Sequence, residues 1–172
     1  MCFLFSKKCK YIKKKYINIV LNDIIYLVIE MKIALGNDHH GIEIKNRIIS
    51  YLTERNLEYV NLGCDEVNNV DYVDYASAVC DKVKTGECNL GILICGTGIG
   101  MSIAANKVSG IFAAKVHSPR EARLCREHNM ANVITLAEYT EDLEGILDSF
   151  INTLPSTEER HKRRFEKICN LR

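Results

Sequence analysis

The chain has 172 residues, of which 47% are hydrophobic and 26% charged, and its formal net charge is +1. This length favours one domain that can bury its own core, and the composition is that of an ordinary soluble globular protein. The near-neutral charge gives no basic face of the kind that binds nucleic acid. The eight cysteines form no C-x-x-C pair and no Cys/His cluster with zinc spacing, so we predict no metal site and a reducing, cytoplasmic environment.

Residues 1–30 differ in character from the rest of the chain. Six lysines lie between Lys7 and Lys15, and only two acidic residues balance them. The apolar run that follows is interrupted by polar residues and is too short to span a membrane, so we expect no membrane insertion. Three interpretations remain: a disordered or helical appendage, a targeting segment, or upstream sequence translated from a wrongly chosen start. We favour the first or the third because Met31 leads directly into a strand.

From Met31 onward, short apolar runs alternate with stretches of helical period. Strands are predicted at residues 32–37, 58–62, 90–94, 111–116 and 132–136. Helices are predicted at 41–55, 72–84, from about 101, at 119–127 after an N-cap at Ser118, at 140–154, and from a Ser156–Glu159 capping box to about Cys169. This alternation predicts an α/β domain over 31–172, a Rossmann-like three-layer sandwich with a five-stranded parallel sheet and helices on both faces.

The third predicted strand ends at Cys95 and runs into a turn rich in glycine, Gly96-Thr97-Gly98-Ile99-Gly100. Parallel sheets bind ligands at the carboxyl ends of their strands, and free N–H groups at such a turn bind anions or stabilise negative charge on oxygen. The G-x-G-x-G spacing, with no acidic residue about twenty positions later, argues against a dinucleotide site. No Gly-Lys-Ser/Thr follows, which excludes a P-loop.

Cys95 itself has two interpretations. It can be a buried structural thiol, as we expect for Cys80 and Cys125, because free cysteine usually packs as a small hydrophobe. Its position immediately before a helix N-terminus instead favours a thiolate, which can act as a nucleophile or a base.

Polar residues also follow the first predicted strand, where Asp38 and His39 are placed to touch a ligand. We expect the next residue, His40, to be only a polar residue of the turn. His128 and Asn129 lie near the end of a predicted helix and are either ligand contacts or a helix C-cap.

Arg160 and Arg164 lie four residues apart in the last predicted helix, so their guanidinium groups share one face. Two such groups suit a phosphate monoester, and the alternative is a solvated basic helix face. A thiol, a hydroxyl, imidazoles, an anion-binding turn and a phosphate clamp together fit proton transfer on a sugar phosphate.

These motifs resemble those of type B ribose-5-phosphate isomerases, a family that also includes galactose-6-phosphate and allose-6-phosphate isomerases. The resemblance runs from Met31 to about Cys169 and leaves residues 1–30 outside. Five motifs carry it in the family's order: GNDHHG at 36–41, DYVDYA at 71–76, ICGTGIGMSIAANK at 94–107, REHN at 126–129 and RHxxR at 160–164.

The resemblance implies an enzyme of the pentose phosphate pathway that interconverts ribose 5-phosphate and ribulose 5-phosphate through a cis-enediolate, without metal or organic cofactor. It implies that Cys95 is the base that moves the proton between C1 and C2. Thr97 matches the hydroxyl that assists proton transfer at O1 and O2. The anion hole for the enediolate matches the backbone N–H groups of the turn, namely Gly96, Gly98, Ile99 and Gly100.

The remaining family positions concern ring opening, phosphate binding and assembly. Asp38 and His128 match groups that open the furanose ring. The phosphate clamp matches His39, Arg160 and Arg164, with His161 nearby, and the pocket lining matches Tyr72 and Asn129. Two subunits share each site in the family, so the resemblance implies a homodimer or homotetramer in which His128 and the arginine pair serve a neighbour's Cys95.

Two positions depart from the family pattern. Many members carry Gly-x-Arg after the fifth strand, where this chain has Ala137-Glu138-Tyr139, and Val73 stands where proline is common. An isomerase of a hexose 6-phosphate is therefore the nearest alternative. A non-catalytic sugar-phosphate-binding module and a thiol-redox protein are more distant alternatives, the last because Cys95 has no resolving cysteine near it in sequence.

Overall fold

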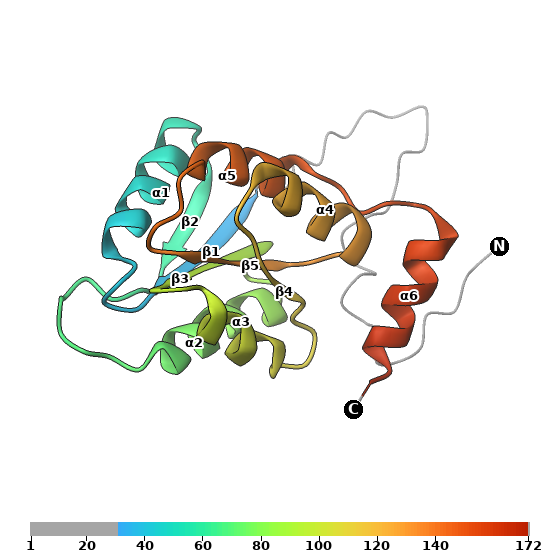
Figure 1. Cartoon of the computed structure of the whole chain (residues 1–172), viewed down its shortest axis with the longest axis horizontal. Coiled ribbons are helices and arrows are strands. Elements are labelled where there is room, and N and C mark those ends of the chain that lie inside the picture. Colours follow the sequence, from blue (N-terminus) through green and yellow to red (C-terminus); the bar gives the residue numbers. More distant parts are fainter. Residues whose placement is uncertain (1–30, 172) are drawn as a thin grey trace.

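A computed structural model describes residues 31–171, so the predictions for residues 1–30 lie outside the described part of the chain (Figure 1). The strands are β1 (Lys32–Asn37), β2 (Glu58–Asn61), β3 (Leu90–Cys95), β4 (Ala113–Lys115) and β5 (Val133–Ala137). The helices are α1 (Ile42–Glu54), α2 (Tyr72–Thr85), α3 (Ile99–Asn106), α4 (Pro119–Asn129), α5 (Leu143–Asn152) and α6 (Glu159–Cys169).

The five strands form one parallel sheet in the order β2-β1-β3-β5-β4, which confirms the predicted α/β class. The three central strands are almost continuously apolar because helices cover both of their faces. Register places Asn37 opposite Ile94 and Cys95 opposite Ala137, so the carboxyl ends of β1, β3 and β5 meet at one edge.

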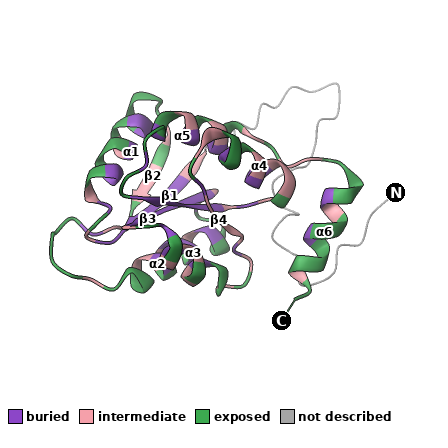
Figure 2. Cartoon of the chain, viewed as in Figure 1, coloured by how far each residue is buried: buried purple, intermediate pink, exposed green. Residues whose placement is uncertain are grey.

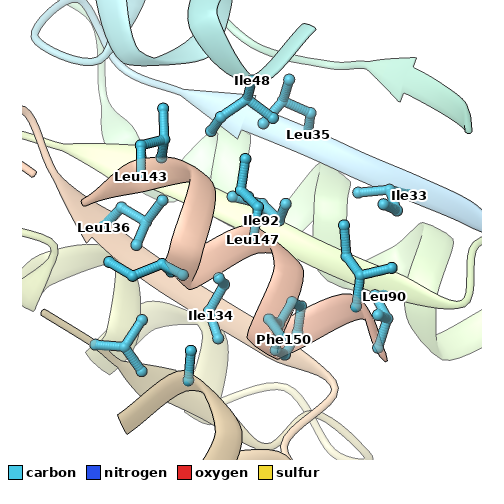
Figure 3. Packing of buried hydrophobic residues seen from close by; sticks show 14 of the residues in the cluster. Ile33, Leu35, Ile48, Leu90, Ile92, Ile134, Leu136, Leu143, Leu147 and Phe150 are labelled. Carbon is cyan, nitrogen blue, oxygen red and sulfur yellow. The ribbon is translucent and has the colours of Figure 1, made fainter. Parts of the chain in front are cut away.

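Helices α1, α4 and α5 pack on one face of the sheet, and α2 and α3 pack on the other (Figure 1). On the first face, Phe150 and Leu147 of α5 are fully buried against strand residues such as Ile92 and Ile134 (Figure 3). On the second face, Val79 of α2 and other apolar side chains meet the opposite side of β1, β3 and β5. The central strands are thus buried between two separate hydrophobic cores, and the predicted three-layer sandwich is confirmed.

Several predicted boundaries were wrong, and each for a local reason. Helix α3 begins at Ile99 rather than near residue 101, because Gly98 takes a left-handed conformation (φ 75°) that starts the helix earlier. The fourth strand covers only 113–115 of the predicted 111–116, because the Ile111 N–H turns back to Val108. Helix α5 begins at Leu143, where the Asp142 side chain caps it, and not at residue 140.

The predicted capping box at the start of the last helix is also wrong. The Ser156 hydroxyl accepts a hydrogen bond from the N–H of Glu158 (3.2 Å), and α6 starts only at Glu159. At the start of α4 the prediction is confirmed, since the Ser118 hydroxyl accepts from the N–H of Glu121.

Helix α6 lies outside the sandwich and beyond α4 (Figure 1). Most of its surface is exposed, and only His161 and Phe165 are buried (Figure 2). Among the described helices, none is long and apolar enough to cross a membrane.

Candidate active site

The centre of the candidate site is the sulfur of Cys95 at the end of β3. The N–H of Gly98 donates a hydrogen bond to Cys95 Sγ at 3.1 Å, and the residue is only 5% exposed. Beside it, the exposed Thr97 hydroxyl accepts from the N–H of Ile99 at 3.3 Å. The amides of Gly100 and Met101 occupy the first turn of α3, where an α-helix has no internal acceptor for them. The predicted thiol, hydroxyl and anion-binding amides are thus brought together.

Glycine is required at position 98 by two independent constraints. Its φ of 75° is a left-handed conformation, and a Cβ added there would lie 3.1 Å from the carbonyl carbon and oxygen of Leu136. The Gly98 carbonyl accepts a buried hydrogen bond of 2.8 Å from the Thr135 hydroxyl of β5. The core strand beside the loop therefore fixes the direction in which Gly98 presents its N–H to the sulfur.

Asp38 follows β1 and lies next to this loop, as predicted. Its N–H donates to the carbonyl of Ile94 (3.1 Å), and its carboxylate accepts from the N–H of His40 (2.9 Å). The side chain is nearly buried, at 5% exposure. His39 is half-buried, and its Nδ1 accepts from the N–H of Val70 (3.5 Å), which ties it to the segment before α2.

Tyr72, at the start of α2, also reaches the loop. A Cβ added to Gly100 would lie 2.8–3.1 Å from the ring and hydroxyl of Tyr72, so the phenol lies directly against the glycine backbone. Tyr72 keeps 39% of its surface exposed and is available to line a pocket.

Two residues of this edge were missed by sequence reasoning. Glu138 Oε2 lies 3.0 Å from His40 Nδ1, and both side chains are half-exposed. A Cβ added to Gly96 would lie 3.6 Å from the His40 ring and 3.9 Å from Glu138 Oε1. The pair therefore covers the first glycine after Cys95, whereas the sequence predicts only a polar turn residue at His40 and no role for Glu138.

Lys45 was also missed. It is fully buried in α1, where its Nζ donates to the carbonyl of Cys64 (2.6 Å) and pairs with Asp65. Lys45 thereby lowers the pKa of the Asp65 carboxyl and holds the segment after β2 beside the strand ends. The sequence contained a signal, because Lys45 stands seven residues before Leu52 and so lies on the buried face of α1.

The other predicted residues gather around α4 and α6. The rings of His128 and His161 are stacked, with centroids 4.2 Å apart and planes inclined by 7°. His161 is 4% exposed, and its Nε2 is buried without a hydrogen-bond partner in the described part of the chain. Arg160 and Arg164 project from the exposed surface of the same helix, and Arg160 Nε pairs with Glu158 at 2.6 Å.

The predicted site is thus divided between two parts of the chain. Cys95, Asp38 and Tyr72 are tied to the glycine loop by the contacts above, whereas His128 lies near the end of α4 and Arg164 lies on α6, outside the sandwich (Figure 1). Asn129, the last residue of α4, lines a separate pocket of about 250 Å³. The other residues around that pocket are mainly apolar: Asn106, Phe112, Ala113, Ala114, Cys125, Ala131 and Ile168.

The thiols of Cys80 and Cys125 behave as predicted for structural cysteines. Burial raises the pKa of both thiols to about 11, so both are protonated at neutral pH. Among the described residues, no group of three or more His, Cys, Asp and Glu side chains is arranged to hold a metal ion.

The fold and the loop define an α/β protein that presents a thiol and a glycine-rich turn at the carboxyl edge of a parallel sheet. Comparisons with known proteins identify the family of this chain. Residues 33–168 match the Ribose/Galactose Isomerase family. Ribose-5-phosphate isomerase B of Escherichia coli K12 is 41% identical over 140 residues, which cover 80% of this chain and 93% of the relative.

Solved structures agree with this match. A ribose 5-phosphate isomerase of Thermotoga maritima superposes with a TM-score of 0.78 at 41% identity, over 82% of this chain and 99% of that one. The type B enzyme of Trypanosoma brucei gives a TM-score of 0.76 at 44% identity, over 81% of this chain and 97% of that one. This chain belongs to the ribose/galactose isomerase family and is an aldose–ketose isomerase that acts on sugar phosphates.

Gly98 and Gly110, two of the three left-handed glycines in the described part of the chain, allow a matched test of the loop. Gly110→Ala should cost about 1–2 kcal/mol, the usual penalty of the left-handed conformation, because an added Cβ meets nothing within 4 Å. Gly98→Ala should cost more, and should also lower kcat, because its Cβ collides with the Leu136 backbone and displaces the N–H from Cys95. Urea denaturation and activity assays measure both effects, and equal losses in the two variants would contradict this account.

His161 should titrate below the ordinary histidine value of 6.5. Burial, then the neighbouring His128 and Arg160, lower its pKa. The unfolded chain therefore binds more protons than the folded one near this value, and stability should fall as the pH falls through 6.5. The imidazole proton shifts in NMR report the titration directly. His161→Phe should make the stability less dependent on pH, and an unchanged dependence would refute the assignment.

Proposed function

We propose that this enzyme interconverts ribose 5-phosphate and ribulose 5-phosphate, with Cys95 as the base. The observation that carries the proposal is the hydrogen bond from the Gly98 N–H to Cys95 Sγ. A backbone donor fixes the orientation of the sulfur, and the same loop offers further amides beside it. A base and an oxyanion site then act on adjacent atoms of one substrate.

The proton transfer follows from this arrangement. The Cys95 thiolate removes the proton from C2 of the open-chain aldose, and the electron pair forms the C1–C2 double bond while O1 becomes negative. The loop amides stabilise this enediolate oxygen. The Thr97 hydroxyl carries the O2 proton to O1, and Cys95 returns its proton to C1 to leave the ketone at C2. The proton that Cys95 takes is the one it gives back, so the step is balanced without a cofactor.

The other predicted residues have roles before and around this step. Asp38, nearly buried beside the loop, and His128 serve to open the furanose ring by moving a proton between the ring oxygen and O1. His39, Arg160 and Arg164 bind the phosphate, for which paired guanidinium groups are well suited. Tyr72 lines the sugar pocket beside the glycine loop of its own chain, and Asn129, next to His128 in α4, lines the pocket of a neighbouring chain.

We propose further that each active site is shared between two copies of the chain, in a homodimer or homotetramer. Cys95 lies at the sheet edge, while Arg160 and Arg164 lie on the outlying helix α6 (Figure 1). The stacked imidazoles of His128 and His161 keep the ring-opening group and the arginines on one surface. His128 and the two arginines can therefore enter the active site of a neighbouring chain together, beside its Cys95.

The relatives support a pentose substrate. The relatives described above are named ribose 5-phosphate isomerases, and the structure of the enzyme from Mycoplasma genitalium, 40% identical, contains bound ribulose-5-phosphate. The proposal carries the expectation of a cytoplasmic enzyme of the pentose phosphate pathway. Side-by-side kcat/KM values for ribose 5-phosphate, allose 6-phosphate and galactose 6-phosphate test it. A preference for either hexose would reject the pentose assignment and favour the alternative that exposed Tyr139 suggests.

Replacement of Cys95 tests the base. Cys95→Ala should lower kcat for ribose 5-phosphate by at least ~10²-fold, the usual contribution of general base catalysis. Cys125→Ala is the matched control, because that thiol is buried in the core and should leave kcat near the wild-type value. A fully active Cys95→Ala enzyme would refute the mechanism.

Mixed oligomers test the sharing of sites. Cys95→Ala and Arg164→Gln chains, each nearly inactive alone, are co-expressed with different tags and the mixed species is purified. If sites are shared, one site in a mixed dimer joins an intact Cys95 to an intact Arg164, and turnover returns to about half the wild-type rate per dimer. Mixed species that stay as inactive as the parents would mean that each chain builds its own site.

A further inference from the structure

We propose that His40 is a further substrate-binding residue and that Glu138 is the positioning residue that holds it. The proposal rests on the proposed sugar-phosphate chemistry at Cys95. The ligand is a hydroxyl or carbonyl oxygen of the sugar at the reacting end of the molecule, beside the Gly96 backbone.

His40 and Glu138 lie at the carboxyl edge of the sheet, on either side of Cys95. His40 follows β1 and Glu138 follows β5, the two strands that flank β3. The Glu138 N–H donates to the carbonyl of Cys95 (3.1 Å), and the His40 N–H donates to the carboxylate of Asp38 (2.9 Å). Both residues are therefore attached through their backbones to groups of the proposed mechanism.

Glu138 fixes the orientation of the His40 imidazole. Nδ1 of His40 faces Glu138 Oε2 at 3.0 Å. The ring atoms nearest to Gly96 are Cγ and Cδ2, at 3.6 and 3.7 Å from an added Cβ. Nε2 is bonded to Cδ2, so the nitrogen that does not face Glu138 is attached to the ring edge next to the glycine loop. A carboxylate that holds one ring nitrogen in this way fixes the tautomer and the direction of the other.

Both side chains of the pair are accessible to a ligand from solvent. The side chains of His40 and Glu138 are 50% and 44% exposed, so a ligand can reach them from solvent. Exposed side-chain pairs of this kind contribute little to stability. The ring of His39, which we place at the phosphate, lies 4.3 Å from that of His40 between centroids. A sugar phosphate that contacts both His39 and Cys95 would therefore lie beside the His40 ring.

The experiment compares kcat and KM for ribose 5-phosphate in three variants. His40→Phe keeps a ring over Gly96 but removes both nitrogens, and should lower kcat/KM about tenfold, as expected for the loss of one substrate hydrogen bond. His40→Gln restores an amide hydrogen-bonding group and should recover activity to within about threefold of wild type. Glu138→Gln, which keeps a neutral acceptor, should cost about threefold because the imidazole is held less firmly.

The Lys82–Glu87 ion pair provides a matched control. It is separated by 2.7 Å, its side chains are 35% and 48% exposed, and it lies at the far end of α2. Glu87→Gln should leave kcat and KM unchanged, and all four variants should melt within a few degrees of wild type. The proposal is overturned if His40→Phe stays within twofold of wild type in kcat/KM. It is also overturned if His40→Phe and His40→Gln are equally impaired, because packing alone would then explain the loss.

A failure of the proposed function would look different. In that case the wild-type enzyme itself would convert no ribose 5-phosphate. Calorimetric titration of ribose 5-phosphate into wild type and His40→Phe then decides the question: weaker binding to the variant supports the contact, and equal affinities overturn it.

Discussion

The structure depends on one constraint, the register of the parallel sheet at the carboxyl ends of β1, β3 and β5. Asn37 pairs with Ile94 and Cys95 pairs with Ala137, so residues from three distant parts of the sequence follow their strands at the same edge. A slip of one residue would turn every core side chain of a strand to its other face. Because the central strands are buried on both sides, the same packing that stabilises the fold also fixes the positions of Asp38, Cys95 and Glu138.

The chemistry of the loop is set by the backbone of the core. Gly98 presents its N–H to the sulfur in a left-handed conformation that side chains rarely adopt, and an added Cβ would press on the Leu136 carbonyl at 3.1 Å. The Thr135 hydroxyl holds the Gly98 carbonyl in place. Lys45 acts in the same way on the segment after β2, since a fully buried ammonium group is stable only with its partners in place. The groups of the proposed mechanism thus lie on a preorganised frame, as the proposed enediolate would require.

The sequence was sufficient for the fold class, for nearly all elements and for the glycine loop, because these depend on local period, glycine position and strand-end placement. It failed where a partner distant in sequence decides the structure. The sequence predicts a turn residue at His40, because its hydrogen-bond partner Glu138 lies 98 positions later in the chain. The start of α6 was misplaced because the backbone N–H of Ser156 bonds to the carbonyl of Glu127 (2.8 Å), which draws the segment before α6 onto α4. Side-chain pairs across a sheet edge have no periodic signal in the sequence.

Helix α6 shows why a single copy of the chain is an incomplete enzyme under the proposed function. An 11-residue helix that buries only His161 and Phe165 contributes little to the core of its own domain. Burial, and then repulsion by the neighbouring His128 and Arg160, lower the pKa of His161. Its Nε2 makes no hydrogen bond in the described part of the chain and lies 3.9 Å from Glu158 Oε2. An anion bound at Arg160 and Arg164 would relieve this repulsion. Under the proposed function, the repulsion between positive charges at α6 would favour phosphate binding there, at the site where a second chain would supply Cys95.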